Sequence, residues 1–329
     1  MTLSTQLERW RARNPLPDGT VTVAAGLIVN GITAYAFLAV AGRTLGPEAN
    51  EPLAVLWAMI YLVGPGFFLP LEQEVSRALA NRWAQGLGAG PLVRQAGLFG
   101  TGLAAVLLVA IATSAGLLLE QLFDDQWLLV VGFALAVFGY AIVHLARGTL
   151  AGLGRFQGYS RYYVAENSLR LVGGVVLALI GVATAGPFGL VVGVTPYLAL
   201  AIALRGEPDL ASPGPPAPWG ELSGALTSLL AASVLTAFLL YAGPVAVQLL
   251  ADESQSGEAS RFLAGLTIAR VPVFLFQAVQ AALLPKLSAL AGAGRFHEFR
   301  QRLSRLLLWV AAIALIGVVG AFVLGPALI

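Results

Sequence analysis

The chain has 329 residues, of which 58% are hydrophobic and 11% charged, and its mean hydropathy is +0.82. These values exclude an ordinary soluble domain and indicate a polytopic helical membrane protein. The absence of cysteine excludes disulfides, thiolate metal sites and cysteine nucleophiles. The net charge of +2 says little by itself, because in a membrane protein the side on which each charge lies matters more.

Residues 1–20 predict a short cytoplasmic surface helix. The apolar run that follows has full membrane length and no small-residue cleavage site, so it is a first span and not a signal peptide. Nine spans are predicted in all, and the fifth, which is short, is expected to begin earlier, near Asn167. The spans are Val21–Val40, Pro52–Leu71, Leu98–Leu119, Trp127–His144, Leu171–Val182, Pro187–Leu204, Leu222–Leu240 (continuing past Pro244), Phe262–Leu284 and Leu306–Leu324.

The basic residues predict the orientation. With a cytoplasmic N-terminus, sixteen of the nineteen Lys and Arg residues fall in cytoplasmic segments, and only Arg43 and Arg261 fall in external loops. An excess of Lys and Arg on the cytoplasmic side is the usual bias of membrane proteins, and the opposite orientation would invert this ratio.

A Pro-rich segment at 206–220 follows the sixth span and is too rich in proline to be helical. It predicts a cytoplasmic linker between a six-span lobe at 21–205 and a three-span lobe at 221–329. A weak internal repeat crosses this boundary. An offset of 207 aligns Pro65 with Pro272, Phe67 with Phe274 and Gln73 with Gln280. Parallel repeats of this kind occur in transporters whose lobes rock around a central site.

The eighth span carries one full charge, Arg270, nine residues after Arg261 and roughly 13 Å along a helix. At 100° per residue, Thr267 and Gln277 lie within about 60° and 20° of Arg270, so the three form a polar stripe. A cation at this depth predicts a functional site, and we assign substrate binding to these three residues. The alternative is an arginine that caps carbonyls or pairs with another helix.

Asn30 lies with Thr22 and Thr33 on one face of the first span. It predicts either substrate contact or hydrogen bonding between helices. Pro65 and Pro272 lie inside spans and predict either hinges for alternating access or static kinks.

Three further motifs are expected to be unremarkable. Glu72 and Glu74, near Arg77, are carboxylates that suit proton or cation coupling, but a solvated helix end is favoured. Asp124-Asp125 is expected to be a solvated turn and not a metal site. The segment 152–156, Gly-Leu-Gly-Arg-Phe, does not have the dinucleotide spacing and, with Arg147, Arg161, Tyr162 and Tyr163 around it, predicts an interfacial elbow on anionic headgroups.

Three segments carry a family resemblance: Arg43-Thr-Leu-Gly-Pro-Glu after span 1, the run from Arg147 to Phe156 after span 4, and Ala269-Arg270-Val-Pro with Leu284-Pro285 in span 8. The chain resembles the Wzx-type polysaccharide flippases of the multidrug/oligosaccharidyl-lipid/polysaccharide (MATE-like) exporter superfamily. The resemblance implies two six-helix lobes around a central cavity that moves an undecaprenyl-diphosphate-linked glycan outward. It also implies that Arg270 faces this cavity.

The family has at least twelve spans, so the C-terminal lobe predicted here is incomplete. The expected function is alternating-access transport in polysaccharide or lipopolysaccharide assembly at a bacterial cytoplasmic membrane. The expected partners are the lipid-linked glycan, membrane lipids and other polysaccharide-assembly proteins, without nucleic acid, cofactor or metal.

Two alternatives remain open. A cation-coupled multidrug exporter usually carries Asp or Glu inside its spans, and the sequence predicts none well within a span, whereas Arg270 favours an anionic substrate. A membrane-embedded glycan polymerase or ligase needs a sizeable loop with convergent acids, histidines or nucleophiles, and the external loops are short. We therefore expect a transporter and not an enzyme.

Overall fold

A computed structural model describes residues 19–223, 226–250 and 257–266, together with single helical positions between 297 and 319. The chain divides into two compact units, one of residues 25–263 and one of residues 1–24 with 264–329. All contacts described below lie within the unit of residues 25–263. Thr267, Arg270 and Gln277, with most of the eighth and ninth predicted spans, lie outside the described residues.

The described residues are almost entirely helical and contain no strand, which confirms the all-α prediction. Residues 258–266 are also helical. The named helices are α2 (Thr20–Ala84), α3 (Gly90–Thr113), α4 (Ala115–Leu122), α5 (Trp127–Gly152), α6 (Phe156–Leu179), α7 (Ala185–Ala203), α8 (Gly220–Ser223) and α9 (Leu226–Leu250).

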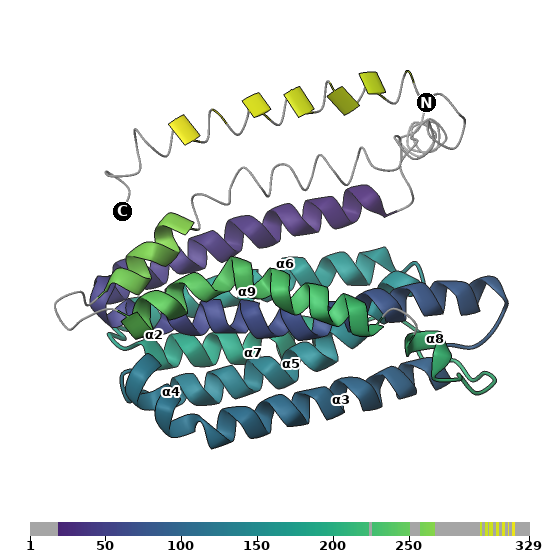
Figure 1. Cartoon of the computed structure of the whole chain (residues 1–329), viewed down its shortest axis with the longest axis horizontal. Helices are drawn as coiled ribbons and strands as arrows, with labels where there is room; N and C mark the ends of the chain where they lie inside the picture. The colour runs from purple at the N-terminus through teal and green to yellow at the C-terminus, as the bar shows by residue number, and fades with distance from the viewer. Residues whose placement is uncertain are drawn as a thin grey trace. The chain divides into compact units, whose positions relative to one another are not determined.

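Helix α2 contains the first two predicted spans. Its backbone leaves helical geometry at Gly46, where φ is 76° and ψ is 168°, a conformation that glycine adopts without strain. The chain reverses direction there, so that Phe37 in the first half stacks on Trp57 in the second, with ring centroids 5.7 Å apart (Figure 1). The predicted loop between these spans is therefore helical on both sides of one glycine.

The fifth predicted span differs most from the structure. We expected Leu171–Val182 with a start near Asn167, but α6 runs from Phe156 to Leu179. Its first half contains charged and tyrosine side chains that resemble a loop in composition. The seventh span was expected to continue past Pro244, and α9 confirms this by running from Leu226 to Leu250.

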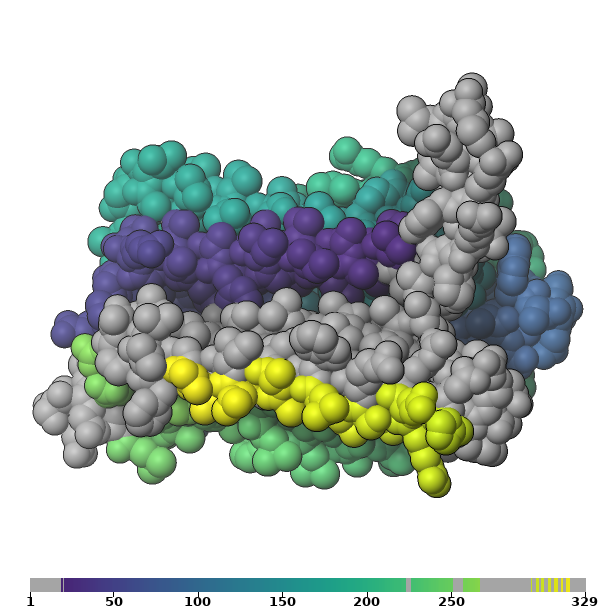
Figure 2. Space-filling view, turned by 90° about the horizontal axis from the view of Figure 1, so that it is seen from above, coloured from purple at the N-terminus to yellow at the C-terminus, as the bar shows by residue number. Residues whose placement is uncertain are grey.

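The helices pack as a bundle of parallel and antiparallel neighbours. The first half of α2 runs parallel to α6, where Gly26 approaches Ser160 and Gly174 approaches Phe37 (Figure 2). The second half of α2 runs parallel to α5, where Gly148 lies against Glu72.

Helices α5 and α7 approach most closely because both present glycine to the interface. A Cβ built on Gly132 would lie 2.5 Å from the Gly189 carbonyl oxygen, and one built on Gly193 would lie 2.5 Å from the Gly132 carbonyl oxygen. Small residues allow this backbone-to-backbone packing in membrane helices. Larger side chains would force the two helices apart.

The Pro-rich segment contains no helix between residues 207 and 218, as its composition predicted. It is held against the turn between α2 and α3. The buried Arg82 guanidinium donates to the Pro215 carbonyl at 2.6 Å and to the Glu221 carboxylate at 3.0 Å. The Gly90 amide donates to the Ser212 carbonyl at 2.8 Å.

Five of the described helices are long and apolar enough to cross a membrane: α2, α3, α5, α7 and α9. Exposed tryptophans mark both ends of the bundle, with Trp127 at the start of α5 and Trp83 and Trp219 at the opposite end. Tryptophan is enriched at membrane–water interfaces. The chain is thus a multi-pass membrane protein.

We predict that Gly132→Ala lowers the thermal stability of the detergent-purified protein, by about 1–3 kcal/mol, because the new methyl group overlaps the Gly189 carbonyl. The matched control is Gly102→Ala, because a Cβ at Gly102 has no atom within 4 Å. Equal melting temperatures for the two variants would contradict the α5–α7 packing.

Candidate functional site

Asn30 is the one predicted site residue among those that the structure describes. Its amide oxygen accepts a hydrogen bond of 2.7 Å from the Asn167 amide nitrogen on α6. The interhelical hydrogen bond that the sequence left open is therefore present. Substrate contact by Asn30 stays a prediction, as do the roles of Thr267, Arg270 and Gln277.

Asn30 is connected through Asn167 to a polar network centred on Arg170. Arg170 is fully buried in the middle of α6. The Arg170 guanidinium donates through Nε to Thr195 Oγ1 on α7 (3.1 Å) and through Nη1 to Asn167 Oδ1 (3.0 Å). Its Nη2 donates to the Tyr140 hydroxyl on α5 (3.1 Å) and to Glu166 Oε1 (2.8 Å).

The same guanidinium packs on α2. Its Cζ lies 5.5 Å from the centroid of the Trp57 ring, a cation–π distance. Arg170 therefore binds side chains of α2, α5, α6 and α7 at once.

This position corrects the sequence analysis, which counted Arg170 among the basic residues of the cytoplasmic segments. Arg170 lies fourteen residues inside α6, and Glu166 lies ten residues inside it. Glu166 is thus a buried acid inside a helix, although α6 is not among the five described helices that are long and apolar enough to cross a membrane. The basic bias of the remaining segments still predicts a cytoplasmic N-terminus.

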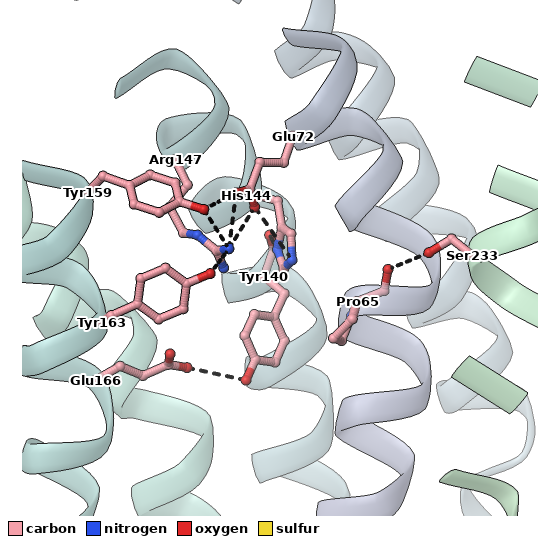
Figure 3. Close-up of polar contacts among 9 residues, drawn as sticks. All are labelled: Pro65, Glu72, Tyr140, His144, Arg147, Tyr159, Tyr163, Glu166 and Ser233. Carbon is pink, nitrogen blue, oxygen red and sulfur yellow. Dashed lines mark hydrogen bonds and ion pairs between the residues drawn. The ribbon is translucent and has the colours of Figure 1, made fainter. Parts of the chain in front are cut away.

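A second buried cluster joins α2, α5 and α6 at Glu72 and Arg147 (Figure 3). Glu72 Oε1 accepts from Arg147 Nη2 at 3.0 Å and from the Tyr159 hydroxyl at 2.8 Å. The Tyr163 hydroxyl also accepts from Arg147. The Arg147 guanidinium lies 4.4 Å from the centroid of the Tyr163 ring and 5.4 Å from that of Tyr159.

His144 connects the two clusters along α5. Its Nδ1 lies 2.9 Å from the Tyr140 carbonyl oxygen, which only accepts, so Nδ1 donates this hydrogen bond. Its Nε2 points toward Glu72 Oε2 at 4.0 Å. The Tyr140 hydroxyl in turn donates to Glu166 Oε1 at 3.2 Å (Figure 3).

The predicted interfacial elbow and the solvated Glu72 are both wrong in part. The turn exists, with Gly154 at φ +70°, but Arg147 is buried among tyrosines. Glu72 and Glu74 are both buried, so the expected solvated helix end is wrong for both. Glu72 lies against Arg147, and Glu74 forms the expected pair with the exposed Arg77 at 2.7 Å. Asp124 and Asp125 form the expected exposed turn.

The two buried clusters balance their own charge. Each pairs one glutamate with one arginine, Glu72 with Arg147 and Glu166 with Arg170, at 3.0 Å and 2.8 Å. Removing one partner of a buried pair is costly because the other charge stays uncompensated. In this arrangement each guanidinium group is paired with a carboxylate of the protein, although the buried Arg147 Nε makes no hydrogen bond.

A sequence signal for these clusters existed but was missed. Tyr140, His144 and Arg147 follow the i, i+4, i+7 spacing of one helical face. On α6 the same spacing continues through Tyr159, Tyr163, Glu166 and Arg170. Placing this second stripe in a loop concealed its periodicity.

Helix α9 packs antiparallel on the second half of α2. Tyr241 stacks on Tyr61 with ring centroids 5.6 Å apart, and the Ser233 hydroxyl donates to the Pro65 carbonyl at 3.0 Å (Figure 3). The predicted hinge Pro65 therefore contacts the first helix of the predicted second lobe.

An open apolar groove of about 280 Å³ lies among α2, α3 and the start of α9. Its lining residues are Leu71, Phe99, Trp219, Leu222, Leu226, Thr227 and Leu230. Among the residues that the structure describes, His, Asp and Glu side chains form no group of three suited to a metal ion.

No protein-family model matches the chain. It is 28% identical over 317 residues to the uncharacterized protein Rv3630 of Mycobacterium tuberculosis, covering 93% of this chain and 69% of that protein. It is 29% identical over 319 residues to the uncharacterized protein Rv1510 of the same organism, with the same two coverages.

Among solved structures, the chain is similar to a crystal structure of MATE in complex with MaD3S. The TM-score is 0.56 at 15% identity, and the match covers 94% of this chain and 73% of that one. The chain therefore has a MATE-like fold.

We predict that Arg170→Met lowers the free energy of unfolding by about 3–5 kcal/mol, because Glu166 keeps its charge in a buried site. The double variant Arg170→Met/Glu166→Gln should recover a large part of this loss. Thermal unfolding in detergent measures both.

The control is Arg261→Met, because the Arg261–Glu258 pair is exposed on both sides and contributes about 1 kcal/mol or less. A single Arg170→Met variant as stable as this control would show that the Arg170 network does not hold the bundle together.

Proposed function

We propose that the protein transports an anionic amphiphile, an undecaprenyl-diphosphate-linked oligosaccharide, across the membrane by alternating access. The MATE-like fold supports a membrane transporter in which two lobes move around a central site. In this proposal residues 21–205 form the first lobe, 206–220 the linker and 221–329 the second lobe. Substrate binding is assigned to Arg270, Gln277, Thr267 and Asn30.

The charge balance of the two buried clusters supports the choice of an anionic substrate. Glu72 neutralises Arg147, and Glu166 neutralises Arg170, so these four buried charges sum to zero. The eighth predicted span adds one charge, Arg270. A cation in a poorly solvated site attracts an anion and repels a cation.

Guanidinium suits a diphosphate in particular. It presents N–H donors in a planar fork that forms two parallel hydrogen bonds with phosphate oxygens. Gln277 and Thr267, on the same predicted helical face, supply neutral donors for further oxygens. The apolar groove between α3 and α9 adds a surface that suits a long hydrocarbon tail.

A cation exporter is the second candidate, and one observation favours it. Glu72 and Glu166 are buried carboxylates in helices, the feature whose absence argued against this class in the sequence analysis. Glu72 and Glu166 each face an arginine in the structure, and a cationic substrate would have to displace that arginine. Glu51 of α2 is a further buried carboxylate, and its oxygens accept backbone N–H groups.

The test of the proposal is export by Arg270 variants of the complete transporter. Arg270→Ala should lower export about tenfold or more, because charge-assisted hydrogen bonds contribute about 1.5–3 kcal/mol. Arg270→Lys should keep partial export because it keeps the charge without the fork, and Arg270→Glu should abolish export. The measurement is export of the lipid-linked glycan, normalised to membrane-inserted protein.

Arg261→Ala is the matched control, since Arg261 is an exposed arginine nine residues earlier in the chain. It should stay within about twofold of the parent, as expected for an exposed ion pair. An Arg270→Ala protein that inserts normally and exports at the parental rate would contradict substrate binding by Arg270.

A further inference from the structure

Asn50 and Glu51 of α2 hold the start of the helix at 258–266. Both oxygens of the Glu51 carboxylate accept backbone N–H groups, from Gly257 at 2.7 Å and from Ala259 at 2.9 Å. The Asn50 amide donates to the Ser260 hydroxyl at 2.7 Å. These contacts join residues more than two hundred positions apart. We call them the Asn50–Glu51 clasp.

The clasp is buried, with Asn50 9%, Glu51 6% and Ser260 9% exposed. A carboxylate at a helix N-terminus satisfies amides that have no partner inside the helix and interacts favourably with the helix dipole. Glu51 thus acts as a cap supplied by another helix. Its charge is compensated by backbone groups, whereas Glu72 and Glu166 are compensated by arginines.

Polar contacts such as those of the clasp suit an interface that opens and closes. When the clasp separates, water can replace each hydrogen bond to the carboxylate and to the amides. The α5–α7 interface differs, because glycine backbones touch there directly, although Tyr197 also donates to the Leu135 carbonyl at 2.7 Å. The molecule therefore combines a fixed interface and a polar, releasable one.

Two glycines with positive φ flank the clasp. Gly46, at φ +76°, breaks α2 four residues before Asn50, and Gly257, at φ +89°, precedes the clasped helix. A Cβ on Gly257 would lie 3.2 Å from Pro47, so the two segments meet at these glycines. Hinges absorb backbone rotation at a few such positions at element ends.

We propose that the Asn50–Glu51 clasp is the gate at the predicted external end of the transporter, and that it opens once in each cycle. The proposal rests on the alternating-access function proposed above. The clasp joins the predicted first lobe to the start of the predicted second lobe, at the end opposite the Arg82-bound linker. The structure holds this gate closed.

Spin labels on the exposed Glu48→Cys and Glu258→Cys positions report the gate, since the protein has no native cysteine. Glu48 lies next to the clasp, its amide nitrogen 3.4 Å from a Cβ built on Gly257. Paramagnetic resonance should show mainly a short distance in the parent. Glu51→Gln should at least double the share of a longer distance, because the amide keeps only one acceptor oxygen.

Asn50→Ala, which removes the bond to Ser260, is the second test variant and should act in the same direction. Thr44→Ala is the matched control, because the Thr44 hydroxyl bonds within its own helix, to the Val40 carbonyl at 2.8 Å. Distance distributions that are identical in the parent, Glu51→Gln and Asn50→Ala proteins would overturn the proposal that the clasp holds the gate closed.

A short bismaleimide that joins the same two cysteines should stop export of the lipid-linked glycan. The control pair is Asn81→Cys with Gln85→Cys, two exposed positions one turn apart at the end of α2 whose side chains lie 3.1 Å apart. Cross-linking this pair should leave export unchanged. A cross-linked gate that still exports at the parental rate would overturn the proposed opening.

The two parts of the experiment separate the two proposals. If the lipid-linked glycan is not exported even without cross-linker, the proposed substrate is wrong, and the spin-label distances still decide whether the clasp opens. If export is normal and the distances never change, the transport proposal survives and the gate does not.

Discussion

The bundle depends on one buried guanidinium. Arg170 has no exposed surface, and it donates hydrogen bonds to α5, α6 and α7 while packing on Trp57 of α2. A charge at this depth is tolerated because Glu166 neutralises it at 2.8 Å and neutral oxygens accept its remaining hydrogen bonds. The position and rotation of α6 follow from this requirement, since any other rotation would turn Arg170 toward lipid.

The two charge-balanced Glu–Arg pairs also limit which charges remain available for binding a substrate. Glu72–Arg147 lies nearer the predicted cytoplasmic end and Glu166–Arg170 nearer the middle, with His144 and Tyr140 between them. Neither pair leaves a spare charge, so these two clusters contribute structure and neutral polar groups to the predicted first lobe, whose buried Glu51 is held by backbone amides. In the proposed function, the charge of the substrate site is therefore assigned to Arg270, and the movement of the predicted lobes is assigned to polar contacts such as that of α2 with residues 257–260.

Hydropathy located most of the helices, because a membrane span needs about 20 apolar residues whatever its partners. It missed the start of α6, since Tyr159, Arg161 and Glu166 look like a loop until the facing side chains of α5 and α2 are known. It also could not pair Glu72 with Arg147, which are 75 residues apart. The Pro-rich segment was predicted to lack a helix, but its attachment through Arg82 depends on the fold. Asn30 was found from its helical face, and its partner Asn167 was not.

The sign of the charge on the transported molecule tests the account most directly. The purified complete transporter, reconstituted in liposomes, would be given a fluorescent undecaprenyl-diphosphate-linked sugar on one leaflet and, separately, a cationic amphiphilic dye. The charge balance predicts that the diphosphate lipid crosses to the other leaflet faster than in protein-free liposomes, while the dye does not. Accelerated movement of the dye without movement of the diphosphate lipid would contradict the account.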